Sequence, residues 1–269
     1  MTDTLRTADP IHDATVGYYE DFAAQYAEHV PDWQGAVGRQ ANVLHRIISG
    51  VLGRDQVSIL DCTCGVGTQA IGLAALGHDV VGSDVSRAAI REARRNAIGH
   101  GVNATFEVCD MRDLGERDGT FDAVLSIDNS LPHLLTDGDL VVAARGMRDR
   151  LRTGGLAVLS MRDYDRLLPG ESRPTTTQPK VWHGPDGLRI AFQTWDWISD
   201  HCYQVEQFLL RQRDHTWHTT SFSGATYRAW RREDVSRAFR AAGFHAIDWQ
   251  FPADNGFHQP VALAVHQGP

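Results

Sequence analysis

The sequence of 269 residues has little that would direct it to a membrane or to nucleic acid. No apolar run approaches the roughly 20 residues that span a bilayer. The first residues, MTDTLRTADP, lack the apolar stretch of a signal peptide. The formal net charge is −8 and no basic patch is evident, whereas binding to a nucleic-acid backbone depends on clustered Lys and Arg. We therefore expect neither a membrane nor a nucleic-acid partner.

Cysteine is scarce as well, and the four that occur follow no metal-ligand spacing: Cys62, Cys64, Cys109 and Cys202. No metal is expected. Cys62 and Cys64 lie too close together for a structural disulfide, which predicts free thiols in a reducing cytoplasm. A chain of this length can form one large α/β domain with an insertion, or two small domains.

The most informative stretch is VSILDCTCGVGT, residues 57–68. Its β-branched and apolar start is typical of a short buried parallel strand. Gly65 and Gly67 then permit a tight turn and close backbone approach to a ligand, and the apolar run 70–76 continues as a helix. A strand, a glycine loop and a helix form half of a nucleotide-binding βαβ unit.

Two ligands fit this loop, and Asp61 at the end of the strand separates them. With Ala70 the loop matches the dinucleotide pattern G-x-G-x-x-A, so a nicotinamide or flavin dehydrogenase is the rival. Asp61 stands four residues before Gly65, where it would repel a pyrophosphate. S-adenosylmethionine (SAM) carries a cationic ammonium and no phosphate, and would gain from the carboxylate. Alternatively, Asp61 only caps the following helix.

Two further strands also end in acidic residues. The strand 79–82 leads to Asp84, placed to bond ribose hydroxyls, and Ser86 caps a helix over 87–100. The next strand brings Asp110 and Met111 to its end, where an adenine amino group and ring would find an acceptor and an apolar face. The carboxyl ends of successive parallel strands share one edge of the sheet, so we expect these residues to surround one ligand.

The fourth strand, 121–127, runs into Asp128, Asn129 and His133 without the Asn-Pro-Pro-aromatic motif of DNA or protein amide methyltransferases. His133 could be a general base, a hydrogen-bond donor to substrate, or a loop histidine. The fifth strand ends at Arg162 and is followed by DYDRLL.

These elements predict an α/β fold with a Rossmann-like seven-stranded sheet and a small antiparallel insertion of three strands, 188–197, 203–212 and 216–223. We expect an N-terminal arm or lid over residues 1–40, a core over 41–168, the insertion as a substrate lid over 169–225, and a last helix with closing strands over 226–269.

The order of motifs resembles the class I SAM-dependent methyltransferases, and within them the glycine and glycine/sarcosine N-methyltransferases, over roughly residues 18–168. The family pattern L-D-x-A-C-G-T-G reads LDCTCGVG here, G-N-S-x-x-H-L reads DNSLPHL, and R-N-Y-D reads RDYD. Asp128 replaces the family's glycine.

The resemblance, together with the residues discussed above, implies a SAM site with Thr63 and Gly65 at the methionine end, Asp84 at the ribose, and Asp110 and Met111 at the adenine. Further expected cofactor residues are Tyr26, Trp33, Arg39, Asp61, Gly67, Val85, Ile127 and His133. The expected substrate residues are Asn129, Arg162 and Tyr164. Of these substrate residues, Arg162 would grip a carboxylate with its fork of N–H groups. A structural Arg162 would instead pair with Asp163 or Asp165.

The expected activity is methyl transfer from SAM to the amine of a small, carboxylate-bearing acceptor, with His133, Asn129 and Arg162 as the catalytic residues. The alternatives are O-methylation of a small natural product, with His133 as base, and a SAM-sensing domain without turnover. A homo-oligomer is compatible with the sequence.

Overall fold

The computed structural model describes residues 9–116, 118–168 and 173–268. The main sheet has seven strands in the order β10-β11-β5-β4-β1-β2-β3 within this part of the chain. Strands β1 to β5 pair in parallel, and β11 runs antiparallel to both of its neighbours. The strands are β1 Ser58–Asp61, β2 Asp79–Asp84, β3 Thr105–Val108, β4 Phe121–Ser126, β5 Leu151–Ser160, β10 Asp248–Gln250 and β11 Val261–Val265. The expected seven-stranded sheet is confirmed.

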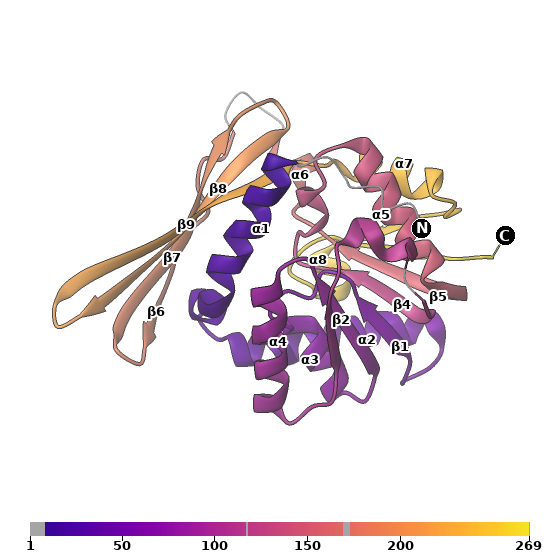
Figure 1. Cartoon of the computed structure of the whole chain (residues 1–269), viewed down its shortest axis with the longest axis horizontal. Coiled ribbons are helices and arrows are strands. Elements are labelled where there is room, and N and C mark those ends of the chain that lie inside the picture. The colour runs from indigo at the N-terminus through magenta and orange to yellow at the C-terminus, as the bar shows by residue number, and fades with distance from the viewer. Residues whose placement is uncertain (1–8, 117, 169–172, 269) are drawn as a thin grey trace.

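Both faces of this sheet are buried, because helices cover each of them (Figure 1). Alternate residues of a strand point to opposite faces, so Ile59 packs in one core cluster and Leu60 in the other. Double burial explains the unbroken apolar run of β1. The longer helices around the sheet are α2 Trp33–Leu52, α3 Thr68–Ala75, α4 Arg87–His100, α5 Asp137–Asp149 and α7 Arg232–Ala241. Short turns of helix follow several strands: η2 Met111–Glu116, η3 Leu131–His133, α6 Tyr164–Leu167 and α8 Pro252–Asn255.

The first helix begins earlier than its apolar spacing suggests. Helix α1 covers Pro10–Phe22 and continues into a 3-10 helix, η1, over Ala23–His29. The carboxylate of Asp9 accepts hydrogen bonds from the backbone N–H of Ile11 and His12, and Pro10 occupies the first helical position. The dipeptide Asp-Pro is therefore the sequence signal that marks this start. Helix α2 then crosses residues 40 and 41, the expected limit between arm and core, without interruption.

The insertion forms a separate antiparallel sheet with four strands instead of the expected three. Its strands are β6 Lys180–Gly184, β7 Gly187–Trp197, β8 Cys202–Arg213 and β9 Thr216–Arg228. The additional strand is β6, which pairs with β7 across a two-residue turn between Gly184 and Gly187. Within the expected insertion over 169–225, residues 169–172 lie outside the described part.

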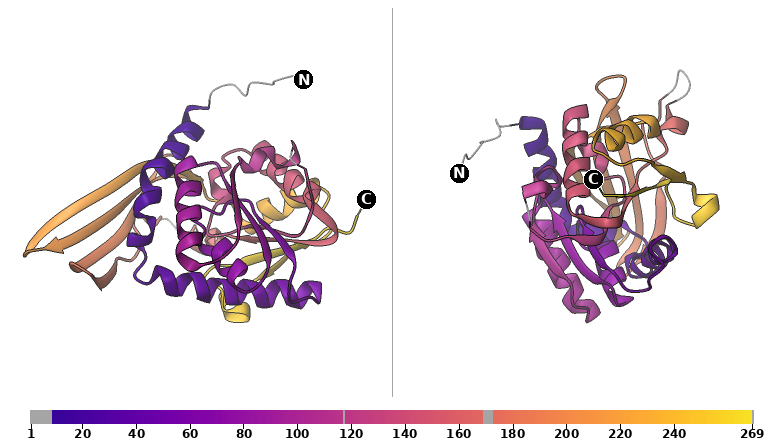
Figure 2. Two further views of the ribbon diagram at one scale, coloured as in Figure 1. Left: turned by 60° about the horizontal axis from the view of Figure 1, so that its bottom comes forward. Right: turned by 90° about the vertical axis from the view of Figure 1, so that its right-hand side faces the viewer.

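Helix α1 lies between the antiparallel sheet and the main body, as Figure 1 and the left view of Figure 2 show. An aromatic cluster joins α1 to the antiparallel sheet: Tyr18 and Phe22 of α1 pack with Trp195, Tyr203 and Tyr227 of that sheet. The four cysteines are free thiols. Among the described helices, none is long and apolar enough to cross a bilayer.

Candidate active site

Two cavities adjoin at the carboxyl ends of the parallel strands. The smaller, of about 120 Å³, lies between the ends of β1, β2, β3 and β4 and is closed on one side by α1. The larger, of about 880 Å³, lies between α1, η1, α2, the end of β5 and the antiparallel sheet. Asp61 of β1 is level with Gly82 of β2 and Leu125 of β4, so the smaller cavity sits where the strand order reverses. Open α/β sheets bind ligands at this point.

Most of the expected cofactor residues line the smaller cavity: Tyr26, Thr63, Gly65, Asp84, Val85, Asp110, Met111, Ile127 and His133. Four others do not. Trp33 is buried and donates its indole N–H to Thr68 Oγ1 at 3.0 Å, at the start of α3. Arg39 lines the larger cavity, where its side chain is 66% exposed and pairs with Asp32. Asp61 and Gly67 are buried and line neither cavity.

The glycine loop is held by the carboxylate of Asp84. The backbone N–H of Gly65 donates to Asp84 Oδ2 at 3.0 Å, and that of Ser86 donates to Oδ1 at 2.9 Å. Gly65 has φ +52°, and no atom lies within 4 Å of the position that a Cβ would occupy there. The loop thus faces open space, and Asp84 lines the same cavity with its pKa raised by burial.

Asp61 is completely buried, and neither of its carboxylate oxygens has a hydrogen-bond partner among the described residues. Burial raises the pKa of Asp61 to about 7 against the influence of the Thr63 backbone N–H, and the charges of Asp84 and Asp128 raise it further. An unpaired buried carboxylate is unfavourable unless a cation comes near. This feature, the open loop and the acidic residue at the end of β2 fit a cofactor that carries positive charge and no phosphate, as SAM does.

The carboxylate of Asp110 is already engaged by protein groups. Its two oxygens share the single Nε–H of Arg112, each at 3.0 Å, Oδ2 also accepts from Nη2, and His12 Nε2 of α1 lies 3.3 Å away. Burial opposes ionisation of Asp110, but the hydrogen bonds from His12 and Arg112 hold its pKa well below the usual range. Asp110 and Met111 border the cavity, as expected, although Arg112 and His12 share the oxygens that an adenine amino group would use.

His133 is fixed as a neutral ring. The carbonyl of Thr226 only accepts, so Nδ1 of His133 carries the proton and donates to it at 3.1 Å. Nε2 then accepts from the hydroxyl of Tyr19 at 2.8 Å, and Tyr227 in turn donates to Tyr19 at 3.2 Å. Burial lowers the pKa of His133 to about 4. Its lone pair holds Tyr19 and is not free to act as a base in this arrangement.

Arg162 reaches the larger cavity without an acidic partner among the described residues. Nη1 donates to the hydroxyl of Tyr203 at 3.1 Å and Nη2 to Oε1 of Gln193 at 2.8 Å, while the guanidinium lies 4.9 Å from the centroid of the Trp195 ring. Asp163 and Asp165 both pair with Arg232 instead. The alternative of a structural pair between Arg162 and these carboxylates is therefore wrong.

Asn129 joins Arg162 on the cavity wall. Its Oδ1 accepts from the backbone N–H of Arg162 at 3.0 Å and from the hydroxyl of Tyr164 at 3.1 Å. Its Nδ2 has no hydrogen-bond partner in the described structure. Tyr164 is fully buried and lines neither cavity, so it positions Asn129 and makes no direct contact with a ligand there.

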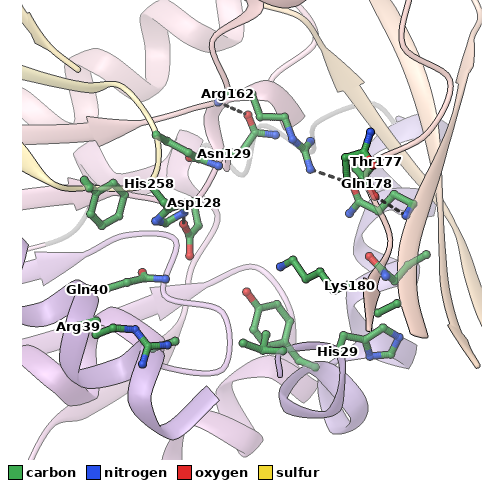
Figure 3. Close-up of a pocket in the computed structure, with 18 of the residues that line it drawn as sticks. His29, Arg39, Gln40, Asp128, Asn129, Arg162, Thr177, Gln178, Lys180 and His258 are labelled. Atoms are coloured by element: carbon green, nitrogen blue, oxygen red, sulfur yellow. Dashed lines mark hydrogen bonds and ion pairs between the residues drawn. The ribbon is translucent and has the colours of Figure 1, made fainter. Parts of the chain in front are cut away.

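Several residues that the sequence did not single out complete the larger cavity. Lys180 extends into it from β6, opposite Asp128 and Asn129, as Figure 3 shows. Tyr19, Tyr227, Gln193 and His258 also line it. Positive side chains predominate over Asp128, the acidic residue among those that line this cavity. The surroundings suit an acceptor that carries an anionic group.

Residues 59–155 match the family described as "Methyltransferase domain". The chain is similar to a glycine/sarcosine N-methyltransferase of Parasynechococcus marenigrum, with 32% identity over 171 residues that cover 63% of this chain and 59% of that protein. It is also similar to a ubiquinone biosynthesis O-methyltransferase of Sinorhizobium fredii, with 30% identity over 123 residues, covering 41% of this chain and 49% of that protein.

Among solved structures, SAM-bound CalS10, an amino pentose methyltransferase from Micromonospora echinaspora, has a TM-score of 0.66 and 19% identity, covering 99% of this chain and 100% of that one. At this identity the likeness shows the fold alone. The similarity to the two curated relatives spans less than two thirds of their length.

Proposed function

We propose that this protein, whose core is a class I SAM-dependent methyltransferase domain, transfers a methyl group from SAM to the amine of a small acceptor that carries a carboxylate. The observation that supports the acceptor class is Arg162, a charged fork on the wall of the larger cavity with its neighbouring aspartates paired elsewhere. Three of its five N–H donors remain after the bonds to Tyr203 and Gln193, enough for a carboxylate.

In this proposal SAM supplies an electrophilic methyl group on a cationic sulfur. Thr63 and Gly65 would hold its methionine end and Asp84 its ribose, with Met111 and Ile127 against the adenine side of the cavity. Arg162 and the free Nδ2 of Asn129 would bind the acceptor carboxylate. Such positioning of two reactants is worth roughly 7–11 kcal/mol of the barrier, so little further chemistry is required of the protein.

The alternatives receive less support. O-methylation of a phenol calls for a base, and the lone pair of His133 is occupied by Tyr19. A domain that senses SAM without turnover has no need of a second cavity with a guanidinium that lacks an acidic partner among the described residues. Because one relative is an O-methyltransferase, the experiment also includes oxygen acceptors.

The test is formation of S-adenosylhomocysteine from SAM with a panel of amino acids, simple amines, carboxylic acids and phenols. We expect turnover with acceptors that have both an amine and a carboxylate. Turnover of phenols alone, or of amines regardless of a carboxylate, would refute the proposed acceptor class.

A further inference from the structure

Among the residues that the structure describes, three side chains line both cavities: Tyr19, Tyr26 and Asp128. They mark the junction where a nucleophile from the larger cavity must meet a methyl group presented from the smaller one. Burial raises the pKa of both tyrosines, which are therefore neutral. Asp128 is the acidic member of the three.

Asp128 occupies an unfavourable backbone conformation. Its φ is +59° and that of Asn129 is +68°, so two successive residues lie in the left-handed region. A residue with a Cβ is uncommon there, whereas glycine adopts such angles freely. The chain nevertheless places a carboxylate at this point, between β4 and the acceptor cavity.

The two oxygens of Asp128 have different surroundings. Oδ2 accepts from the side-chain amide of Gln69 of α3 at 2.8 Å, which fixes the carboxylate. Oδ1 is buried and lies at ion-pair distance, 2.7 Å, from Nε2 of His258. The Asp128 side chain as a whole is 25% exposed, and Oδ2 has a second lone pair beside the bond from Gln69, so Oδ2 is the oxygen that can accept from a ligand. Asp128, Asn129 and His258 lie together on one wall in Figure 3.

We infer that Asp128 binds the amino group of the acceptor at the junction of the two cavities and selects nitrogen over oxygen nucleophiles. This inference rests on the proposed function and deepens it. A neutral amine donates an N–H to the carboxylate and keeps its lone pair for the methyl carbon. A phenol can donate its O–H to the carboxylate but is not ionised by so weak a base, and a phenolate is repelled by the charge of the carboxylate.

The charge movement of the reaction favours the same role. The acceptor nitrogen bonds to the methyl carbon while the carbon–sulfur bond breaks and its electron pair stays on sulfur. Positive charge passes from sulfur to nitrogen, and the extra proton of the product ammonium is later lost to water. A carboxylate beside that nitrogen stabilises the transition state more than the neutral amine, so it raises kcat as well as binding. Together with Arg162, Asp128 makes the cavity complementary to a molecule with an amine at one end and a carboxylate at the other.

The test compares Asp128→Asn with the wild type on the best amine acceptor and on a matched phenol. Asparagine tolerates positive φ and keeps an oxygen for Gln69, but it removes the charge. We expect kcat/KM for the amine to fall about 10- to 100-fold, the scale of a hydrogen bond to a charged group, with part of the loss in kcat. The preference for amine over phenol should shrink, and SAM affinity should stay within about twofold.

Asp214→Asn is the matched control, because Asp214 also has positive φ (+47°) but belongs to the hairpin between β8 and β9. Its kinetics should be those of the wild type. Asp128→Gly should show the same loss as Asp128→Asn without a lower thermal midpoint, because glycine removes the backbone strain.

The inference is overturned if Asp128→Asn keeps the wild-type kcat/KM and nitrogen preference, or if its main defect is in SAM binding. A wild-type enzyme that methylates only oxygen would overturn the proposed function as well. Normal turnover of amines by both the wild type and Asp128→Asn would overturn the role of Asp128 alone.

Discussion

Replacing Arg162 by methionine should separate acceptor binding from cofactor binding and from folding. The substitution leaves no protein group without a partner. Oε1 of Gln193 still accepts from the indole N–H of Trp195 at 3.2 Å, and the hydroxyl of Tyr203 still bonds to that of Tyr164 at 2.7 Å. Methionine also fills space against the Trp195 ring that the guanidinium now covers. We therefore expect a folded protein with SAM affinity close to that of the wild type.

The loss should fall on the acceptor. A carboxylate in this half-buried cavity without its charged partner loses about 2–5 kcal/mol of binding, which corresponds to a rise in KM of roughly 30-fold or more. Steady-state kinetics with varied acceptor, beside calorimetric titration of SAM on the same sample, measures both effects. Arg162→Lys is the matched control: it keeps the charge but not the fork, and should recover only part of the affinity. An unchanged acceptor KM in Arg162→Met would refute the assignment.

Two further substitutions test residues assigned to SAM binding, and a third tests the burial of His133. Asp84→Ala should weaken SAM binding by about 1.5–3 kcal/mol in calorimetry. Unchanged SAM affinity would show that Asp84 only supports the glycine loop. The pKa of Asp61 is about 7, so its carboxylate ionises as the pH rises, and SAM should bind more tightly at about pH 8 than at about pH 6. Asp61→Asn should lose this difference, and an identical pH dependence would contradict the role of its charge. His133 has a pKa of about 4 when folded and about 6.5 when unfolded, so the unfolded chain binds the extra proton between these values. The free energy of unfolding of the wild type should therefore fall as the pH drops through that range. In urea unfolding, the fall for His133→Gln should be smaller by up to about 3 kcal/mol. The same fall in both proteins would contradict burial of a neutral ring.

Local patterns were sufficient for the part of the fold that surrounds the cofactor. Helix α4 has the bounds expected from the cap residues Ser86 and Gly101, because each cap acts through bonds within a few residues. The glycine loop and Asp84 lie together as expected, since parallel strands bring their carboxyl ends to one edge.

The acceptor side depends on contacts that no local pattern contains. Tyr19 bonds to His133 over 114 positions of sequence, and Arg162 to Tyr203 over 41. Tyr18 is buried in the aromatic cluster, whereas its neighbour Tyr19 also lines the smaller cavity. The local sequence does not predict strand β6, because its five residues include the charged Lys180 and follow a segment rich in Thr and Pro.

The burial of Tyr164 shows a related limit. Its neighbour Arg162 lines the cavity, whereas the phenol of Tyr164 points into the protein and holds Asn129. A motif marks a segment as part of a site, but only tertiary packing decides which of its side chains faces the ligand.

The most direct test of the account is methyl transfer from SAM labelled with carbon-13 in its methyl group, followed by NMR of the product mixture. With an acceptor pool that includes amino acids, amines and phenols, we predict that the label appears as an N-methyl signal of compounds that carry a carboxylate. Label found only in O-methyl signals, or only in amines without a carboxylate, would contradict it.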